Sequence, residues 1–387
     1  MFIGQKGLGK FRKSKAYGLI GCLTLATVMG LASTELPVIG GGVVHAEVIQ
    51  GGNDIKDVDV HSTVANGVAM TYTTYDSGSS GKQTSSGSGV FVAPNVMVTV
   101  AHNYYDKSPE DKSAVLRGGD SAKSYVVMNS ETEKVNKVPN SGSSESVSKD
   151  AIHTYNEKDF GKSYSNDLAV VVTEKPVEAM TNGEDSPRTL SENPVSTGDS
   201  ISMVGYPNDF STPNLNQENR NRLKDGKPYE ISGKVSAYDK ESGAVTYHTS
   251  SLGGFSGAPL FNSKGEVVGV HQHGTNAPSE LEANRIGGGT IFTEKHKEWI
   301  RSMIDKYAIT GWFVEGDNRY YYDEQHRALK NLDKVIDGAT YRFNERGQAT
   351  LLSGVEKGRV ILRLEDANGN RLIADKVVQT GEVGAPL

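Results

Sequence analysis

The feature that most constrains the fold is a series of short apolar runs between residues 65 and 303, separated by Gly, Ser, Asn and Pro. Runs of this kind are typical of β-strands, and the clearest are residues 90–92, 96–100, 168–172, 201–204 and 267–270. Helical spacing of apolar residues is scarce, which argues against an α/β hydrolase. The pattern therefore predicts an all-β barrel or sandwich, with surface loops over 76–87 and 129–165.

One helix is expected over residues 294–307. Four apolar side chains fall there at helical spacings, namely Trp299, Ile300, Met303 and Ile304. Such a stripe packs one face of a helix against the body of a domain.

The first residues have the organisation of an export signal. Basic residues between 6 and 15 precede an apolar stretch over 16–32, and residues 44–46 offer a small residue, Ala46, for cleavage. We therefore expect residues 1–46 to be a signal peptide and the protein to be secreted. A retained membrane anchor is the alternative, because the apolar stretch is close to the length that spans a bilayer.

Cysteine and charge exclude several classes of protein. The single cysteine, Cys22, lies within the signal. Only six uncharged residues separate Lys15 from Cys22, too few for the apolar core of a lipoprotein signal. The mature chain is thus expected to contain neither a disulfide nor a thiol nucleophile. A net charge of −6 argues against nucleic acid as a partner.

Three motifs carry the elements of serine-based acyl transfer, which needs a nucleophile, a base, an orienting carboxylate and oxyanion donors. Ser256 lies in the glycine-rich segment GGFSGAP, where the amides of Gly254 and Ser256 can point at one oxyanion. His102 ends an apolar run, and Asp167 begins another. Each alone is compatible with a turn or a structural residue. Together they occur in the order His, Asp, Ser, 65 and 89 residues apart, the order of chymotrypsin-type enzymes.

Six motifs over residues 48–304 resemble the glutamyl endopeptidase and exfoliative-toxin branch of the trypsin-like serine proteases. They are residues 101–102, 166–170, 204–207, 253–259, 268–271 and 289–292. The resemblance implies two antiparallel six-stranded barrels with the active site between them, followed by a C-terminal helix, in a protease domain over residues 47–308. It implies protein or peptide substrates; we expect a monomer with no cofactor and no metal.

The resemblance also implies a pocket for glutamate. In that family, the histidine matching His271 binds the substrate carboxylate, and a hydroxyl matching Ser251, often threonine, assists it. Imidazolium and hydroxyl donors suit a carboxylate. Two alternatives remain open: His271 is a structural barrel histidine, or it forms a metal pair with His273, two residues along the same strand face.

Val48 is the expected first residue of the active enzyme. Residues 48–54 resemble the mature start of glutamyl endopeptidases, whose terminal amine neutralises the substrate carboxylate. Glu47 alone separates Val48 from the expected signal cleavage site after Ala46, and glutamate is the residue this enzyme is expected to cut after. The alternative is that Val48 begins a disordered tail.

The C-terminal part has a different composition. Two segments match at an offset of 21 residues, pairing Tyr320, Tyr322, Asp323, Glu324 and Ala328 with Tyr341, Phe343, Asn344, Glu345 and Ala349. They resemble aromatic repeats that bind choline or glucans, so residues 309–356 are expected to bind cell-wall carbohydrate or choline through residues 311–350, or to be a degenerate spacer. Residues 357–387 contain an Asn-Gly turn signal and resemble part of a β-type surface repeat.

These observations predict a secreted serine endopeptidase with a preference for Glu and secondarily Asp, retained at a Gram-positive cell surface. Phe255 departs from the polar residue usual before the nucleophile and motivates a rival, a toxin-like protease of narrow specificity in which bulk holds Gly254 closed. A surface adhesin that merely presents the repeats is the rival outside the enzymes.

Overall fold

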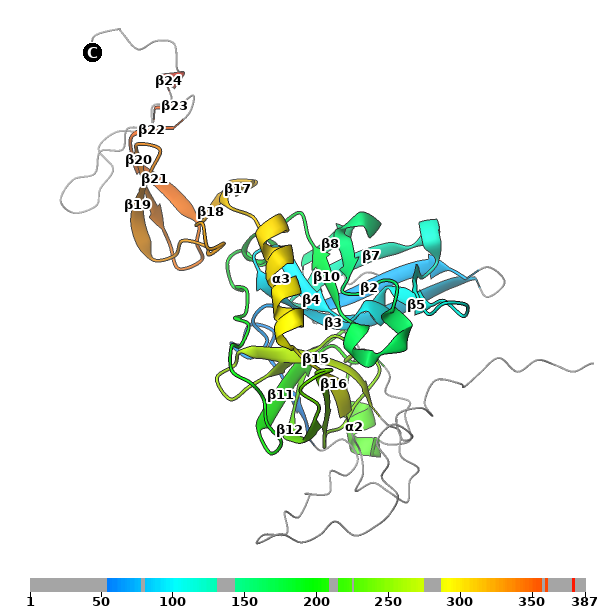
Figure 1. The fold of residues 1–387 in the computed structure, drawn as a ribbon. Coiled ribbons are helices and arrows are strands. Elements are labelled where there is room, and N and C mark those ends of the chain that lie inside the picture. Colours follow the sequence, from blue (N-terminus) through cyan, green and yellow to red (C-terminus); the bar gives the residue numbers. More distant parts are fainter. Residues whose placement is uncertain are drawn as a thin grey trace, which may run out of the picture. The chain divides into compact units, whose positions relative to one another are not determined.

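The computed structural model describes residues 54–77, 81–130, 143–208, 215–224, 226–274, 287–356, 359–360 and 378–379 (Figure 1). The expected signal peptide, Cys22 and Val48 lie outside these residues, so export and the mature start stay predictions. Among the helices described, none combines the length and hydropathy needed to cross a bilayer.

The first half of the described chain forms one antiparallel sheet in the order β8-β7-β2-β3-β4-β10-β9. Its strands are β2 (Val68–Asp76), β3 (Lys82–Ala93), β4 (Val96–Thr99), β7 (Lys123–Met128), β8 (Ser143–Val147), β9 (Ile152–Thr154) and β10 (Ala169–Val172). All of β4 is buried, because Met97 packs with Phe91 on one face while Val98 packs with Val90 on the other. A continuous apolar run is the sequence signature of such a doubly covered strand.

The second half forms a closed six-stranded barrel, since β13 pairs with β12 as well as with β16. Its strands are β11 (Ser200–Gly205), β12 (Tyr229–Tyr238), β13 (Ala244–Tyr247), β14 (Pro259–Phe261), β15 (Val267–Gly274) and β16 (Gly287–Ile291). A short strand, β1 (Ile55–Asp57), pairs with β12 and adds the beginning of the described chain to the barrel. Met203, Ile231 and Leu260 are among the side chains that fill the interior.

The expected all-β architecture is confirmed, with one difference. The first barrel is a half-barrel, because no pairing in the described part of the chain joins β8 to β9. The expected loops are wrong over 82–87, which pair with β2, and over 143–147 and 152–154, which form β8 and β9. Composition does not reveal these polar strands, because a strand with a solvated face is held by backbone hydrogen bonds and needs few apolar residues.

The edge strand β8 alternates exposed serines with the buried Glu145 and Val147. An Oε1 atom of Glu145 accepts hydrogen bonds from the backbone N–H of Glu174 at 2.5 Å and of Lys175 at 3.1 Å. Burial raises the pKa of this carboxyl group. Glu145, on the edge strand β8, therefore accepts hydrogen bonds from two backbone N–H groups of the segment that follows β10.

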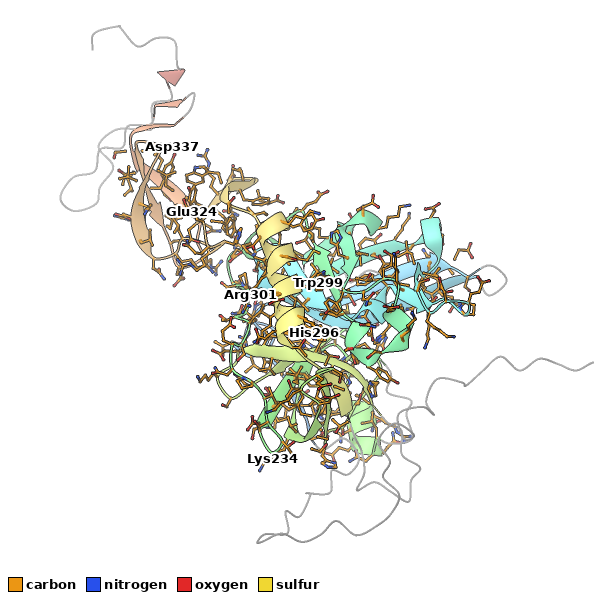
Figure 2. All side chains as sticks on the ribbon, in the orientation of Figure 1. Lys234, His296, Trp299, Arg301, Glu324 and Asp337 are labelled. Atoms are coloured by element: carbon orange, nitrogen blue, oxygen red, sulfur yellow. The ribbon has the colours of Figure 1, made fainter. Side chains whose placement is uncertain are left out.

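The helix α3 (Glu294–Tyr307) has the predicted bounds. It begins with a capping box in which Thr293 and His296 each accept a hydrogen bond from the other's backbone N–H. Ile300 is buried against the half-barrel cluster that contains Val98, and Figure 2 shows His296, Trp299 and Arg301 along the helix. His296 Nε2 lies 3.0 Å from the carbonyl oxygen of Ser165, which ties the helix to the segment before Asp167.

The remaining elements are short. The helices α1 (Val177–Met180) and α2 (Gln217–Arg222) and the hairpin of β5 (Tyr105–Lys107) and β6 (Ala114–Leu116) connect the larger strands. Beyond α3, β17 (Gly311–Glu315) pairs with β18 (Asn318–Tyr322), and β19 (Leu332–Ile336), β20 (Ala339–Phe343) and β21 (Ala349–Ser353) form a second small sheet. The last strands are β22 (Val355–Glu356), β23 (Arg359–Val360) and β24 (Val378–Gln379).

The aromatic residues of the C-terminal part lie largely in its interior. Tyr320, Tyr322, Tyr341 and Phe343 are buried, and the Trp312 ring packs edge-on against Tyr341 with centroids 4.6 Å apart. The Tyr322 hydroxyl donates a 3.0 Å hydrogen bond to Glu178 of α1, whose pKa burial raises to about 7. Wall binding and the boundaries at residues 309 and 357 stay predictions, and the Asn368-Gly369 turn lies outside the described residues.

Candidate active site

His102 and Asp167 come from neighbouring strands of the half-barrel. β4 ends at Thr99, and the chain turns at once through a single 3₁₀ turn, Ala101–Asn103, that carries His102. Asp167 lies two residues before β10, which pairs directly with β4. Ala169 is opposite Thr99 in this register, so the two functional side chains emerge at the same end of the paired strands.

The structure brings the three predicted residues into one hydrogen-bonded row. His102 Nδ1 lies 2.6 Å from Asp167 Oδ2, and His102 Nε2 lies 2.7 Å from Ser256 Oγ. The other carboxylate oxygen of Asp167 accepts a 2.9 Å hydrogen bond from the backbone N–H of His102. The Asp167 side chain is 11% exposed and that of His102 34%, so the carboxylate is shielded while the imidazole remains accessible. A base held this way can take the Ser256 proton.

Ser256 lies on the barrel side, in the turn before β14. Its carbonyl oxygen accepts a 2.7 Å hydrogen bond from the backbone N–H of Ser88 in β3, so the segment that carries Ser256 is attached to the half-barrel. Gly257 has a φ of +86°, and a Cβ there would lie 2.1 Å from the Ser88 carbonyl oxygen. Only glycine fits this close approach, which explains the glycine after the serine.

The Gly254 amide has a defined orientation. The carbonyl of Gly253 accepts a 2.8 Å hydrogen bond from the backbone N–H of Asn208. In a trans peptide the N–H points opposite to the C=O, so the Gly254 N–H is directed away from Asn208. Phe255 is buried, with its ring edge-on to His271 at a centroid distance of 6.4 Å.

His271 is 1% exposed on β15, between two hydroxyl groups. Its Nδ1 is hydrogen-bonded with the Tyr247 hydroxyl, and its Nε2 lies 2.9 Å from Ser251 Oγ. Burial, followed by the nearby His273 and His102, lowers the pKa of His271 to about 3. The imidazole is therefore neutral at physiological pH, whereas the family resemblance led us to expect an imidazolium.

His273 has different neighbours from His271. The strand register shifts between the two residues, and the His273 ring packs on Tyr164 with centroids 4.6 Å apart. Across the described ranges, no group of three or more His, Cys, Asp or Glu side chains is arranged to hold a metal ion.

Comparison with known proteins bears on this arrangement. Residues 87–270, which include all three residues of the row, match the family described as "Trypsin-like peptidase domain". Over these residues the chain is similar to trypsin-like peptidases. Among curated proteins, this chain is similar to glutamyl endopeptidases of Staphylococcus aureus strains MRSA252 and MW2, each 28% identical over 120 residues. That match covers 31% of this chain and 28% and 30% of the two relatives, less than a third of their length.

Two solved structures are similar to this chain at low identity. A Glu endopeptidase in complex with MPD is 22% identical with a TM-score of 0.46, and the match covers 66% of this chain and 98% of that one. An inactivated protease paralogue of the scabies mite is 16% identical with a TM-score of 0.43, covering 66% and 100%.

Three further residues of the peptidase domain support the site but have no motif of their own. Tyr247 ends an ordinary alternating strand, and only the barrel closure brings its hydroxyl to His271. The Gln272 amide donates to the carbonyl oxygens of Tyr164 at 2.7 Å and Asp167 at 3.1 Å, which fixes the segment that carries the carboxylate.

The third is Asp54, at the beginning of the described chain. Its carboxylate accepts hydrogen bonds from the backbone N–H and the hydroxyl of Ser250, at 2.6 and 2.5 Å. Ser250 precedes Ser251 directly, so the N-terminal segment is attached beside the His271 pocket. The sequence offered Asp54 only as the end of the resembling segment 48–54.

Proposed function

We propose that the protein is a serine endopeptidase with His102, Asp167 and Ser256 as its catalytic triad. The observation that carries the proposal is the row of two hydrogen bonds, 2.6 and 2.7 Å long, that joins these side chains across the two halves of the domain. This is the arrangement in which a carboxylate orients an imidazole and the imidazole activates a serine hydroxyl.

The reaction proceeds in two steps, acylation of Ser256 and hydrolysis of the acyl-enzyme. Ser256 Oγ attacks the carbonyl carbon of the scissile peptide bond as its proton moves to His102 Nε2, and the carbonyl electron pair moves to oxygen. Collapse of this tetrahedral species breaks the C–N bond, and His102 gives its proton to the leaving amine. A water molecule then attacks the acyl-enzyme, passes a proton to His102, and releases the acid as Ser256 recovers that proton.

The oxyanion is stabilised by the backbone N–H groups of Gly254 and Ser256. Donors aimed in advance at the developing charge provide the largest single contribution in such enzymes. The orientation of the Gly253 carbonyl toward Asn208 supports this role, because it leaves the Gly254 N–H on the opposite side of the peptide. The same orientation argues against the toxin-like rival, in which Phe255 holds Gly254 closed.

The enzyme prefers glutamate before the scissile bond, with aspartate second. His271 and Ser251 receive the substrate carboxylate. In the tautomer proposed, Tyr247 donates to His271 Nδ1 rather than to the carbonyl oxygen of Gly288, 3.2 Å away. His271 Nε2 is then protonated and able to donate beside the Ser251 hydroxyl. Because burial keeps His271 neutral, a second group must supply positive charge. The free amine of Val48, ordinarily protonated below pH 7.7 to 8.0, supplies it.

The Asp54 anchor supports this role for Val48. Asp54 is held beside Ser251 through Ser250, and six residues of chain span at most about 20 Å, so Val48 is within reach of the pocket. The test compares protein beginning at Val48 with a Glu47→Gln protein that keeps residue 47. Under the proposal the extra residue displaces the amine and severely weakens cleavage after glutamate. Equal rates of glutamate cleavage by the two proteins would show that the amine has no role in binding the substrate carboxylate.

A random peptide library tests the function as a whole. Cleavage mapped by mass spectrometry is expected after Glu, then Asp, and a fluorophosphonate probe is expected to label Ser256. Failure to react with the probe would favour the adhesin, whereas labelling with cleavage of a single folded protein and no peptides would favour the toxin-like protease.

Secretion and retention at a Gram-positive cell wall, with choline or carbohydrate as ligand of residues 311–350, are a separate proposal. Its support is the period of 21 residues together with a surface hollow lined by Asp333, Arg342, Phe343 and Glu345. Binding of the Ser256→Ala protein to purified cell walls tests it, with Asp333→Ala as the variant expected to reduce retention. If a protein ending at Tyr307 is retained on cell walls as well as the full chain is, the proposal of wall binding through residues 311–350 is wrong.

A further inference from the structure

Ser88 is a buried serine of β3 whose side chain takes no part in the proposed chemistry. It is 0% exposed. Its Oγ accepts a 2.8 Å hydrogen bond from the backbone N–H of Tyr206 and lies 2.9 Å from the carbonyl oxygen of Gly254. The N–H of Tyr206 can only donate, and the carbonyl of Gly254 can only accept. The single hydroxyl proton of Ser88 therefore points at Gly254.

This contact is one of three that fix the peptide groups on either side of Gly254. The preceding peptide is held by the 2.8 Å bond from Asn208 N–H to the Gly253 carbonyl. The following peptide is held by Ser88 at its carbonyl and, at its N–H, by a longer 3.3 Å bond from Phe255 to the Leu252 carbonyl. Gly254 itself has a φ of +93°, and a Cβ on it would lie 2.4 Å from the Tyr206 carbonyl oxygen. With both flanking peptide planes held, the direction of the Gly254 N–H is set before any substrate arrives.

We propose that Ser88 is a positioning residue for the oxyanion hole: its hydroxyl holds the Gly254 carbonyl so that the Gly254 N–H remains aimed at the developing charge. The proposal rests on the oxyanion role given above to Gly254. It also explains why a serine is found in the fully buried part of β3, which continues with Val90 and Phe91.

Ser88→Ala tests the proposal, because it removes the hydroxyl while keeping the backbone contact of residue 88 with Ser256. Loss of a whole oxyanion donor costs about 10²- to 10³-fold in kcat. Loss of its support should cost less, and we expect kcat to fall about 10- to 30-fold with KM unchanged. Affinity for a peptide boronic acid, which forms a tetrahedral adduct, is expected to fall by the same factor, while the affinity of the cleaved acid product stays unchanged.

Ser124→Ala is the matched control. Ser124 is a buried serine of the same sheet that pairs with Thr73 at 3.0 Å, away from the nucleophile. Its loss is expected to lower the Tm without changing kcat or boronate affinity. A second variant, Ser88→Cys, keeps a side chain of similar shape with a weaker donor, and its kcat is expected to lie between those of Ser88→Ala and the parent.

Ser88 has no positioning role if Ser88→Ala keeps the parental kcat, or if product affinity falls as much as boronate affinity. If Ser88→Ala does not fold, a Ser88→Cys protein with the parental kcat and boronate affinity overturns the proposal equally. An inactive parent would instead remove the proposed peptidase function, so the two failures are distinguishable.

Discussion

Two histidines define two regions of this domain, and their surroundings are opposite. His102 is a third exposed and faces the carboxylate of Asp167, whereas His271 is buried and faces the hydroxyls of Tyr247 and Ser251. The carboxylate orients the imidazole beside the Ser256 hydroxyl, as the proposed proton transfers require. Burial without a charged partner keeps His271 neutral, which suits a fixed donor. Under the proposed function, the same type of side chain is thus a base in one region and a recognition group in the other.

The largest effect is expected in the catalytic region. Ser256→Ala should leave the fold intact and lower kcat by at least about 10⁴-fold, because loss of a triad member leaves only binding and oxyanion stabilisation. His102→Ala should match it, since nucleophile and base act as a unit. Turnover of an optimal peptide, with circular dichroism as the control for folding, checks both. Near-parental activity of either variant would show that the assignment of the triad is wrong.

The specificity region should respond selectively. His271→Ala is expected to lower kcat/KM for a Glu peptide about 10²-fold, because the substrate carboxylate loses a buried partner. A matched peptide with Gln or Ala before the scissile bond should be affected far less, because the triad stays assembled. The two peptides are measured with the same preparation, and equal losses on both would make His271 a structural residue.

The charge state of the pocket can be tested by pH. The ratio of kcat/KM for Glu and Gln peptides cancels every effect of pH that is common to the two substrates. With His271 neutral and Val48 positive, the ratio should stay constant from about pH 5.5 to 7 and fall about tenfold as pH rises through and beyond the usual amine pKa of 7.7 to 8.0. A ratio that instead rises steadily as pH falls from 7.5 to 5.5 would show that His271 takes up a proton with the substrate.

The smallest effect is expected at Tyr247. Tyr247→Phe removes the hydroxyl that orients His271 while keeping the ring in the barrel. A neutral hydrogen bond contributes about 0.5 to 1.5 kcal/mol, so kcat/KM for the Glu peptide should fall about 3- to 10-fold, with little change for the Gln peptide. Tyr229→Phe, a fully buried tyrosine in the same barrel, is the control for stability. Equal effects on both peptides would show that Tyr247 acts on the barrel as a whole.

The two regions also differ in how far the sequence predicts them. His102, Asp167 and Ser256 lie at the ends of apolar runs or in a glycine-rich turn, so local patterns name them and their order indicates how they meet. The partners of His271 come from β13 and from the segment before Ser256. The family resemblance predicts Ser251, but no pattern in the sequence indicates Tyr247. Its neutral state follows from burial in the closed barrel, a tertiary property that the residue type does not carry. The half-barrel likewise depends on polar edge strands whose pairing is made by backbone groups.

The edge strand β8 has a consequence for the behaviour of the protein in concentrated solution. An unclosed sheet leaves backbone donors and acceptors at its rim, and another extended chain can pair with them. A closed barrel has no such rim, so the half-barrel is where association through strands would begin. Short polar edges and inward-pointing charges discourage such pairing, and β8 has both: five residues, Ser-Ser-Glu-Ser-Val, with Glu145 turned inward onto the backbone of residues 174 and 175. A strand adding to β8 would have to keep that carboxylate buried and satisfied, so Glu145 disfavours strand addition at the open side of the half-barrel.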